Sequence, residues 1–222
     1  MLLGGVPGVE AGKVLVLGGG VVGSSAIRVA LGMGADVTVL DRSVSRLGEL
    51  DEQYRGQLRT VYSTAEALEQ HVREADLIIG AVLIPGASAP KLITAEMLAD
   101  VKHGTVMVDV AIDQGGCFET SRATTHADPT YVVDGVVHYC VANMPGAVAR
   151  TATMALTNAT LPYVTRLASD DVSSLLLEDR HFAAGLNIVH GQLTHRAVAD
   201  ALGQTWTEPD QVLRTSLHLK SA

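Results

Sequence analysis

The stretch Lys13-Val-Leu-Val-Leu-Gly-Gly-Gly-Val-Val-Gly23 decides the fold of this 222-residue chain. Its first five residues have the apolar pattern of a buried strand, and a helical pattern follows the spaced glycines. Gly18 permits a tight turn, Gly20 lets the backbone approach a pyrophosphate, and Gly23 allows close packing of helix and strand. The N-terminus of such a helix offers unpaired N–H groups and partial positive charge to phosphates. The arrangement predicts dinucleotide binding, and a glycine turn in an unrelated α/β domain is the alternative.

A second strand pattern, Val37-Thr-Val-Leu-Asp41, ends in an acid that indicates which dinucleotide binds. Asp41 falls 18 residues after Gly23, close to the offset at which a carboxylate accepts hydrogen bonds from the adenosine ribose. A carboxylate there binds a free 2′-hydroxyl and repels a 2′-phosphate, which favours NAD over NADP. Arg42 is the competing feature, because a guanidinium can pair with a phosphate. Asp41 occupies the ribose position itself, so the predicted cofactor is NAD.

The composition is typical of a compact globular protein. Hydrophobic residues make up 47% of the chain and charged residues 18%, which argues against disorder. The formal net charge is -8, and no basic block offsets it, which argues against nucleic acid as a partner. No apolar run is long enough to cross a membrane, and the N-terminus lacks the basic region of a signal peptide. We therefore expect a soluble, cytoplasmic protein whose two cysteines are reduced thiols.

Apolar runs alternate with helical patterns through the first two-thirds of the chain. The expected strands are rich in Val, Ile and Leu, as in a sheet covered on both faces, and comprise residues 13–17, 36–40, 58–62, 76–82 and 105–110. The expected helices comprise residues 21–33, 43–54, 65–74 and 95–101. This order predicts an α/β fold with a Rossmann-type, doubly wound parallel sheet. The Asp134-Gly135 dipeptide is a turn former, so residues 130–141 are expected to make a hairpin or strand pair.

The pattern changes after Pro145. Residues 148–168 are expected to form one long helix, which Pro162 kinks or ends. Shorter helices are expected near residues 172–183 and 194–202, followed by a tail. The sequence thus predicts a dinucleotide-binding domain over residues 1–147. Residues 148–222 are expected to be a connecting helix and a helical segment of an incomplete second domain.

Ligands of a doubly wound sheet lie across the carboxyl ends of its strands, so residues after each strand are candidates for chemistry. Asp113, after the fifth strand, is placed to orient a ribose or substrate or to transfer a proton; a turn-forming Asp is the alternative. Asn143 and Met144 follow the last strand, where hydrogen bonding and ring packing compete with a simple pre-proline turn. Ser63, after the third strand, either contacts the adenine side or caps a helix in a capping box with Glu66.

The histidines and cysteines predict neither a metal site nor a thiol nucleophile. The eight histidines do not cluster at metal-ligand spacing, and the pair His190 and His195 is more typical of solvated helix faces. Cys117 follows a glycine turn with Glu119 nearby, but no histidine lies at an offset suited to a thiolate pair. We therefore expect no metal and a structural role for Cys117.

Several stretches resemble alanine dehydrogenases, in the family that also contains the NAD-binding part of proton-translocating transhydrogenases. The matching runs cover nearly the whole chain and thin out after Leu167. They comprise residues 3–9, 18–23, 34–41, 80–87, 89–93, 108–117, 139–145 and 155–163. The runs Asp113-Gln-Gly-Gly-Cys117 and Asn143-Met-Pro145 are specific, and they favour the alanine dehydrogenase branch.

The resemblance implies NAD-dependent, reversible oxidative deamination of L-alanine to pyruvate and ammonia. Asp113 matches the catalytic aspartate of the family. The implied cofactor contacts are Gly18, Gly20, Val21, Gly23, Asp41, Arg46, Ser63, Val82, Leu83, Val110, Ala111, Ile112, Asp113, Arg122, Val141, Ala142, Asn143 and Met144. Family members form hexamers or smaller closed assemblies, so a homo-oligomer is also implied.

The chain departs from the family pattern in two ways. Family enzymes have a further N-terminal segment that supplies an arginine, a lysine and a catalytic histidine for pyruvate, whereas this chain begins roughly at the dinucleotide-binding domain. We therefore expect it to bind NAD but to turn alanine over weakly or not at all alone, and to associate with such a segment. Some relatives carry metal-binding Glu and His where this chain has Arg166 and Asp170, which implies no metal. The alternative functions are a non-catalytic NAD-binding or assembly module and a transhydrogenase-like NAD-binding subunit.

The C-terminal part carries apolar residues that such a missing domain would cover. They lie on the expected long helix and at Leu175, Leu176, Leu177 and Phe182, and exposed apolar patches of this kind drive association. If the chain alone proved active, Arg122, Lys91 and His190 would be the first candidates to replace the missing groups.

Overall fold

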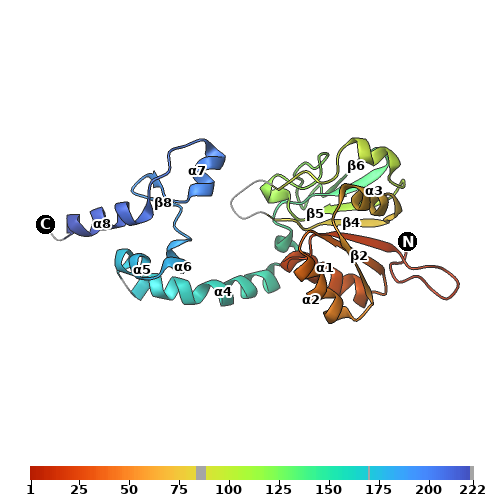
Figure 1. Ribbon diagram of the computed structural model, residues 1–222, viewed down its shortest axis with the longest axis horizontal. Helices are drawn as coiled ribbons and strands as arrows, with labels where there is room; N and C mark the ends of the chain where they lie inside the picture. The colour runs from red at the N-terminus through yellow and green to blue at the C-terminus, as the bar shows by residue number, and fades with distance from the viewer. Residues whose placement is uncertain (84–88, 170, 221–222) are drawn as a thin grey trace. The chain divides into compact units, whose positions relative to one another are not determined.

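The structure, a computed structural model, describes residues 1–83, 89–169 and 171–220 (Figure 1). Residues 84–87, which belong to the matching run 80–87, and Asp170 lie outside the described residues. The chain divides into two compact units, of which one ends at Met144 and the other continues from Pro145.

The first unit is built on a seven-stranded sheet with the order β3-β2-β1-β4-β5-β7-β6. Its strands are β1 (Lys13–Leu17), β2 (Asp36–Asp41), β3 (Leu58–Tyr62), β4 (Leu77–Gly80), β5 (Val106–Asp109), β6 (Thr130–Val133) and β7 (Val136–Tyr139). All neighbours are parallel except β6 and β7. The strand order reverses direction between β1 and β4, which makes this the switch point of a doubly wound fold. The predicted α/β fold and largely parallel sheet are confirmed.

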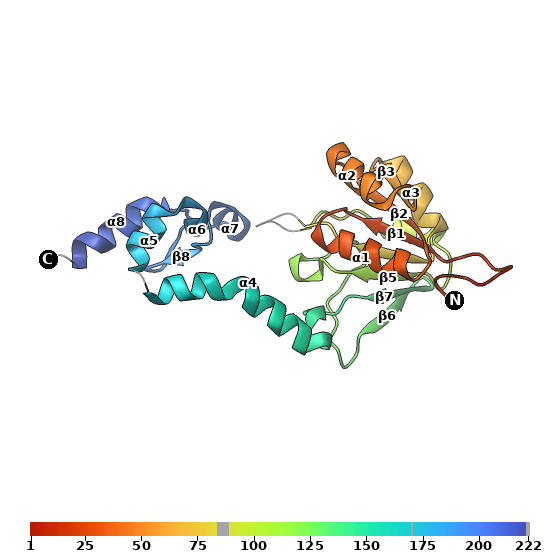
Figure 2. The ribbon, with the colours of Figure 1, turned by 90° about the horizontal axis from the view of Figure 1, so that it is seen from below.

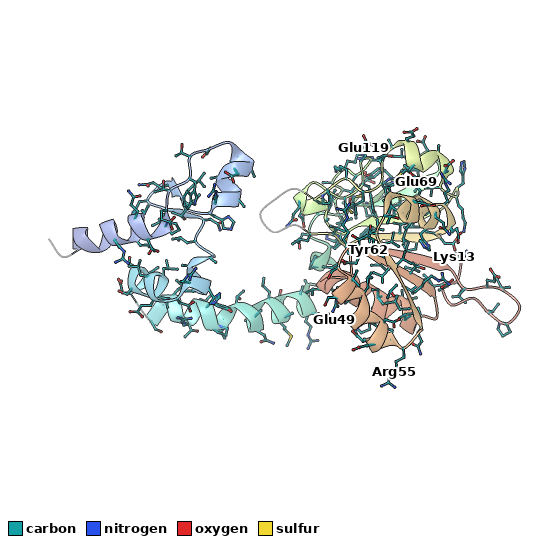
Figure 3. The ribbon with its side chains drawn as sticks, in the orientation of Figure 1. Lys13, Glu49, Arg55, Tyr62, Glu69 and Glu119 are labelled. Carbon is teal, nitrogen blue, oxygen red and sulfur yellow. The ribbon has the colours of Figure 1, made fainter. Side chains whose placement is uncertain are left out.

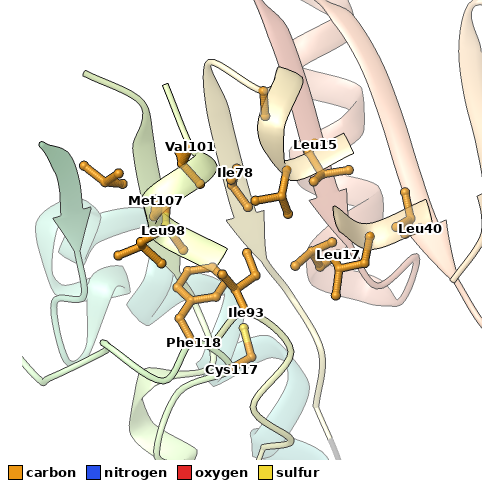
Figure 4. Close-up of a cluster of buried hydrophobic side chains, with 14 of the residues drawn as sticks. Leu15, Leu17, Leu40, Ile78, Ile93, Leu98, Val101, Met107, Cys117 and Phe118 are labelled. Carbon is orange, nitrogen blue, oxygen red and sulfur yellow. The ribbon is translucent and has the colours of Figure 1, made fainter. Parts of the chain in front are cut away.

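Alternate residues of β1 build two cores, one on each face of the sheet. Val14 and Val16 pack in a cluster with residues of α1 (Val21–Gly32) and α2 (Val44–Tyr54). Leu15 and Leu17 pack in a second cluster with residues of α3 (Ala65–Glu74) and the 3₁₀ helix η1 (Glu96–Asp100). Figure 4 shows this second cluster. Both faces of the central strand are therefore covered, which explains its unbroken apolar sequence.

The second cluster also reaches the loop that follows β5. Phe118 and Cys117 are fully buried beside Ile93 (Figure 4), and Ile93 forms an isolated bridge with Phe118. The segment after β5 is thereby anchored in the core rather than lying on the surface.

The Asp134-Gly135 dipeptide makes the predicted hairpin between β6 and β7. Both residues have positive φ, 48° and 78°, as the central residues of a type I′ turn require. Strand β7 then pairs in parallel with β5 and extends the main sheet. The hairpin interpretation is confirmed.

The second unit contains five α-helices and a short hairpin within the residues described. They are α4 (Ala149–Ser169), α5 (Val172–Glu178), α6 (Arg180–Ala183), β8 (Ile188–Val189), β9 (Gln192–Leu193), α7 (Arg196–Leu202) and α8 (Pro209–Lys220). The 3₁₀ helix η3 (Met144–Val148) precedes α4. The expected C-terminal tail is instead α8, whose first helical position is occupied by Pro209, where proline is favoured.

The expected long helix is confirmed, because α4 does not end at Pro162 but continues to Ser169. Asn158, whose carbonyl loses its helical partner at Pro162, is exposed to water. One expectation for this unit was wrong. Leu175 and Leu176 are buried within the unit, where α5 contacts α8 (Figure 2), rather than left for another domain to cover.

Helix α4 itself has no buried residue. Its Arg166 forms an ion pair of 2.9 Å with Asp179, the residue that caps α6, and its Tyr163 stacks on Phe182 of α6. In the parts of the chain that the structure describes, no helix is both long enough and apolar enough to cross a membrane.

Candidate functional site

The predicted site residues of the first unit follow the carboxyl ends of strands along one edge of the sheet. Across that edge, Ser63 follows β3, Asp41 ends β2, Gly18–Gly23 follow β1, Val82 and Leu83 follow β4, Val110–Asp113 follow β5, and Val141–Met144 follow β7. The topology thus gathers segments that are far apart in the sequence. Arg46 and Arg122 come from other positions, on α2 and on the segment between β5 and β6.

The three motif glycines have different physical roles. Gly18 has a φ of +94°, and a Cβ on Gly23 would lie 1.8 Å from Gly18 O. The fold therefore requires both of these glycines. Among the described residues, apart from its two chain neighbours, a Cβ on Gly20 would meet no atom within 4 Å, and Gly20 gives α1 no side-chain cap. The space and the N–H groups at the start of α1 therefore remain available to a ligand.

Asp41 ties the glycine turn to the helix that follows β2. Its Oδ2 accepts a hydrogen bond of 2.7 Å from Gly19 N, and its Oδ1 accepts one of 2.8 Å from Ser43 N. Ser43 caps α2 in turn, by accepting from Arg46 N. A carboxylate with two N–H donors is pre-oriented and retains lone pairs for further donors.

Arg46 supports the same turn from α2. Its Nε donates to Gly19 O and its Nη2 donates to Ser24 Oγ, both at 2.7 Å. Its guanidinium also pairs with Glu49, which Figure 3 labels on the same helix. Arg42 is exposed and has no ion pair among the described residues.

Ser63 does not cap α3, so that interpretation was wrong. Thr64 is the cap, and its hydroxyl accepts a 3.0 Å hydrogen bond from Ala67 N. Ser63 instead bonds through its backbone N–H to Asp41 O at 3.0 Å. Its hydroxyl makes no hydrogen bond within the described chain, and contact with the adenine side stays a prediction.

Asp113 lies on η2 (Ile112–Gln114), a single 3₁₀ turn directly after β5. Ala111 and Ile112 are buried and anchor this turn, whereas Asp113 is exposed. No described residue makes a hydrogen bond or ion pair with the Asp113 carboxylate. Gly115 and Gly116 follow with φ of 88° and 74°, and reverse the chain back into the core.

Asp109 is a residue of this edge that the sequence reasoning missed. It ends β5, is fully buried, and accepts hydrogen bonds from Ala111 N, Cys117 N and Phe118 N at 2.9–3.3 Å and from the Ser121 hydroxyl. The sequence feature that could have revealed it is an acid at the end of an apolar strand, shortly before two glycines. Such an acid needs several donors, because a buried carboxylate without them is costly.

Lys91 and Glu119 also bind the backbone around this loop. Lys91 Nζ donates to Gly115 O, Gly116 O and Phe118 O at 2.6–3.1 Å. An ammonium has three protons, so Lys91 is committed to the loop and is a poor replacement for a substrate-binding cation. Glu119, labelled in Figure 3, accepts from Ala95 N at 2.7 Å.

Arg122 is held by an aromatic stack. Its guanidinium lies 3.9 Å from the centre of the Tyr131 ring, and Tyr131 stacks on His138 at 4.9 Å. The Tyr131 hydroxyl accepts from Arg122 N and donates to Thr120 O. Burial, with the nearby Cys140 thiol, raises the pKa of Tyr131 to about 12, so the hydroxyl keeps its proton.

His138 is a neutral core residue rather than a catalytic group. Its Nδ1 lies 3.1 Å from Val136 O, and its Nε2 lies 2.8 Å from the Thr120 hydroxyl. A carbonyl can only accept, which assigns the proton to Nδ1. Burial lowers the pKa of His138.

The segment after β7, residues 141–144, contains the last of the predicted site residues along the sheet edge. Val141 is fully buried and bridges Thr124, so its side chain faces the protein core. Asn143 has a φ of 55°, which asparagine tolerates better than most residues, and its carbonyl accepts a 3.0 Å hydrogen bond from His126 Nε2.

The surroundings of Cys117 suit a structural role rather than that of a nucleophile. Burial, and then the neighbouring Asp109 carboxylate, raise the pKa of its thiol well above the usual range. A thiol that stays protonated is a poor nucleophile. Within the described ranges, no group of three or more His, Cys, Asp or Glu side chains is arranged to hold a metal ion.

Comparisons with known proteins agree with this geometry. Residues 1–196 match the family described as "Alanine dehydrogenase/PNT, C-terminal domain". An alanine dehydrogenase of Halomonas elongata is 67% identical over 94% of this chain, and one of Staphylococcus saprophyticus is 52% identical over 96%. These matches cover 56% and 58% of the two relatives, so the chain spans a little over half their length.

Solved structures give the same result. An L-alanine dehydrogenase superposes with a TM-score of 0.83 at 50% identity, over 91% of this chain and 56% of that one. A transhydrogenase from Sinorhizobium meliloti superposes with a TM-score of 0.58 at 33% identity, over 66% of this chain and 41% of that one. NAD, which Gly18–Gly23 and Asp41 predict, is the cofactor of this family. The sequence motifs, the sheet edge and these matches together show that the chain belongs to the alanine dehydrogenase/PNT C-terminal domain family.

Proposed function

We propose that this chain is the NAD-binding part of an alanine dehydrogenase, which converts L-alanine reversibly to pyruvate and ammonia. The observation that carries the proposal is the shared edge of the sheet, where an open glycine turn, the Asp41 carboxylate and the exposed Asp113 follow successive strands. The identity to alanine dehydrogenases, higher than to the transhydrogenase, supports this branch of the family.

The described residues fit NAD. The open space at Gly20 and the uncapped start of α1 suit a pyrophosphate. A carboxylate has about four acceptor sites, and Asp41 uses two of them within the protein, which leaves acceptors for ribose hydroxyls. The residues after β4, β5 and β7 would hold the nicotinamide end. NAD, when bound, supplies the acceptor for the hydride that leaves the substrate.

Asp113 would move the proton that accompanies substrate oxidation. Its carboxylate is exposed and makes no hydrogen bond with any described residue, so it is available to a substrate or a water. A positioned proton-transfer group contributes about 10²–10⁴-fold to a rate.

A polypeptide of these 222 residues alone is proposed to bind NAD but to reduce it negligibly with L-alanine. The family resemblance implies that the groups that bind the substrate carboxylate come from an N-terminal segment of the family enzymes. Substrate positioning contributes as much as proton transfer, or more. Loss of both kinds of group reduces turnover by several orders of magnitude.

Calorimetric titration with NAD and NADP, followed by an absorbance assay for NADH formed with L-alanine, tests the proposal. We expect NAD to bind more tightly than NADP, and NADH to form only when the N-terminal part of the Halomonas elongata relative is added. Asp113→Asn should abolish that restored activity, whereas Asp128→Asn, an exposed acid of the same unit, should not. NAD binding without restored activity would favour a non-catalytic module, and no NAD binding would refute the proposal.

A further inference from the structure

We propose that Asp109 is the positioning residue of the nicotinamide-end loop, defined here as residues 111–118, and that Lys91 assists it from the other side. The loop carries Asp113, so the inference rests on the proposed function. Neither residue is placed in contact with substrate or cofactor, and both act through the loop backbone.

The Asp109 carboxyl group accepts hydrogen bonds from backbone N–H groups of the loop. Its Oδ1 accepts from Ala111 N at 3.1 Å, and its Oδ2 accepts from Cys117 N at 2.9 Å and Phe118 N at 3.3 Å. The Ser121 hydroxyl donates to Oδ2 as well. One fully buried side chain therefore joins the start of the loop to its end, and buried N–H groups without such an acceptor would be costly.

Lys91 donates hydrogen bonds to backbone carbonyls of the same loop. Its ammonium donates to Gly115 O, Gly116 O and Phe118 O. The Phe118 peptide unit is thus held at both ends, by Asp109 at its N–H and by Lys91 at its carbonyl.

Close packing leaves the loop little room for another arrangement. A Cβ on Gly116 would lie 2.6 Å from Asp109 Oδ2, and a Cβ on Gly80 would lie 2.2 Å from Cys117 Sγ. The two glycines are therefore explained by the Asp109 carboxyl group and by the Cys117 side chain that it orders.

Asp113 depends on this loop because its own side chain is held by no described residue. Its location is set by the backbone alone, and a misplacement of about 1 Å can cost about 10²-fold in rate. The adenosine end of the site is supported separately, by Asp41 and Arg46 around the glycine turn. Within the described ranges, no hydrogen bond of Asp109 or Lys91 reaches that end.

This separation defines the experiment. The affinities of NAD and of ADP, which lacks the nicotinamide half, are measured by calorimetry for Asp109→Asn and Lys91→Met. Asparagine keeps the size of Asp109 but turns an acceptor into a donor that faces N–H groups. Lys91 is exposed, so its substitution leaves the core intact. We expect both variants to weaken NAD binding about tenfold and to leave ADP binding within about twofold. Asp128→Asn, the matched exposed control, should change neither.

Hydrogen exchange of the Cys117 and Phe118 amides is the second measurement, and it needs no ligand. We expect exchange at both amides to accelerate in Asp109→Asn while β1 and β2 stay protected. Equal losses of NAD and ADP affinity would mean that Asp109 supports the whole unit, and unchanged NAD affinity would mean that the loop does not need it. Either outcome overturns the inference. If the unmodified chain bound neither ligand, the proposed function would fail, and unaltered exchange would overturn the Asp109 inference by itself.

Discussion

Gly20→Ala and Gly23→Ala should separate ligand binding from folding, although both replace a glycine of one motif by the same residue. At Gly20 the added methyl meets no atom within 4 Å in the part of the chain that the structure describes, its chain neighbours aside, and the φ of -67° is ordinary for alanine. At Gly23 the methyl would lie 1.8 Å from Gly18 O. The first variant therefore occupies the space that we propose for a pyrophosphate, and the second forces α1 away from β1.

The magnitudes follow from these contacts. Alanine is a poorer helix cap than glycine by about 0.5–1 kcal/mol, and the loss of unfolded-state entropy returns about 0.4–1 kcal/mol. The free energy of unfolding of Gly20→Ala should thus stay within about 0.5 kcal/mol of the unmodified chain. Its NAD affinity should fall at least tenfold, which is about 1.4 kcal/mol. Gly23→Ala should lose at least about 3 kcal/mol of stability, at the upper end for overpacked sites because backbone rather than a flexible side chain is in the way.

Urea denaturation followed by circular dichroism measures the stabilities, and calorimetry with NAD measures the affinities. Gly48→Ala, on the exposed face of α2, is the control and should gain about 0.5–1 kcal/mol, because no described residue outside the helix backbone lies within 4 Å of its added methyl. Gly20→Ala with unaltered NAD affinity would refute the assignment of the open space to a phosphate. Gly23→Ala with unaltered stability would refute the packing argument.

Three further predictions concern Asp41, His138 and Gly135. Asp41→Ala should weaken NAD binding about ten- to a hundredfold in calorimetry, because a hydrogen bond to a charged group is worth about 1.5–3 kcal/mol. If the unmodified chain bound NADP and NAD equally well, Arg42 rather than Asp41 would determine the cofactor preference. Burial lowers the pKa of His138, so the histidine binds a proton more readily in the unfolded chain than in the folded one. The free energy of unfolding should therefore be highest above about pH 6.5 and fall as the pH drops below that value. In urea titrations the fall should be smaller for His138→Gln. Gly135→Ala should cost about 1–2 kcal/mol in the same measurement, because Gly135 has a φ of 78° and its added methyl would lie 2.9 Å from the His103 ring.

The parts of the fold that depend on local pattern could be predicted from the sequence. The strands around Gly18–Gly23 are short apolar runs between glycines, and parallel order follows from their alternation with helices. The Asp134-Gly135 turn was predictable because few other dipeptides accept two positive φ values.

The parts that depend on distant partners could not be predicted. Asp109 lies among apolar residues of β5, and its donors come from residues up to Ser121, which only the folded loop brings back to it. In the sequence, Lys91 cannot be distinguished from an ordinary surface lysine. Only the folded chain brings the carbonyls of Gly115, Gly116 and Phe118 within hydrogen-bond distance of its ammonium group. The cover over α5 comes from α8, in a stretch of the sequence with too few local cues to predict a helix.

The Asp41 carboxylate accepts hydrogen bonds from two backbone N–H groups, and this has a consequence for how cofactor preference can evolve. If Asp41 binds the ribose as proposed, a change that admits a 2′-phosphate must remove its negative charge, and a neutral replacement no longer offers both oxygens that accept from Gly19 N and Ser43 N. Specificity and local stability are therefore inherited together. A laboratory lineage selected for NADP use should first accumulate substitutions that secure the glycine turn or the start of α2, and lose Asp41 only afterwards.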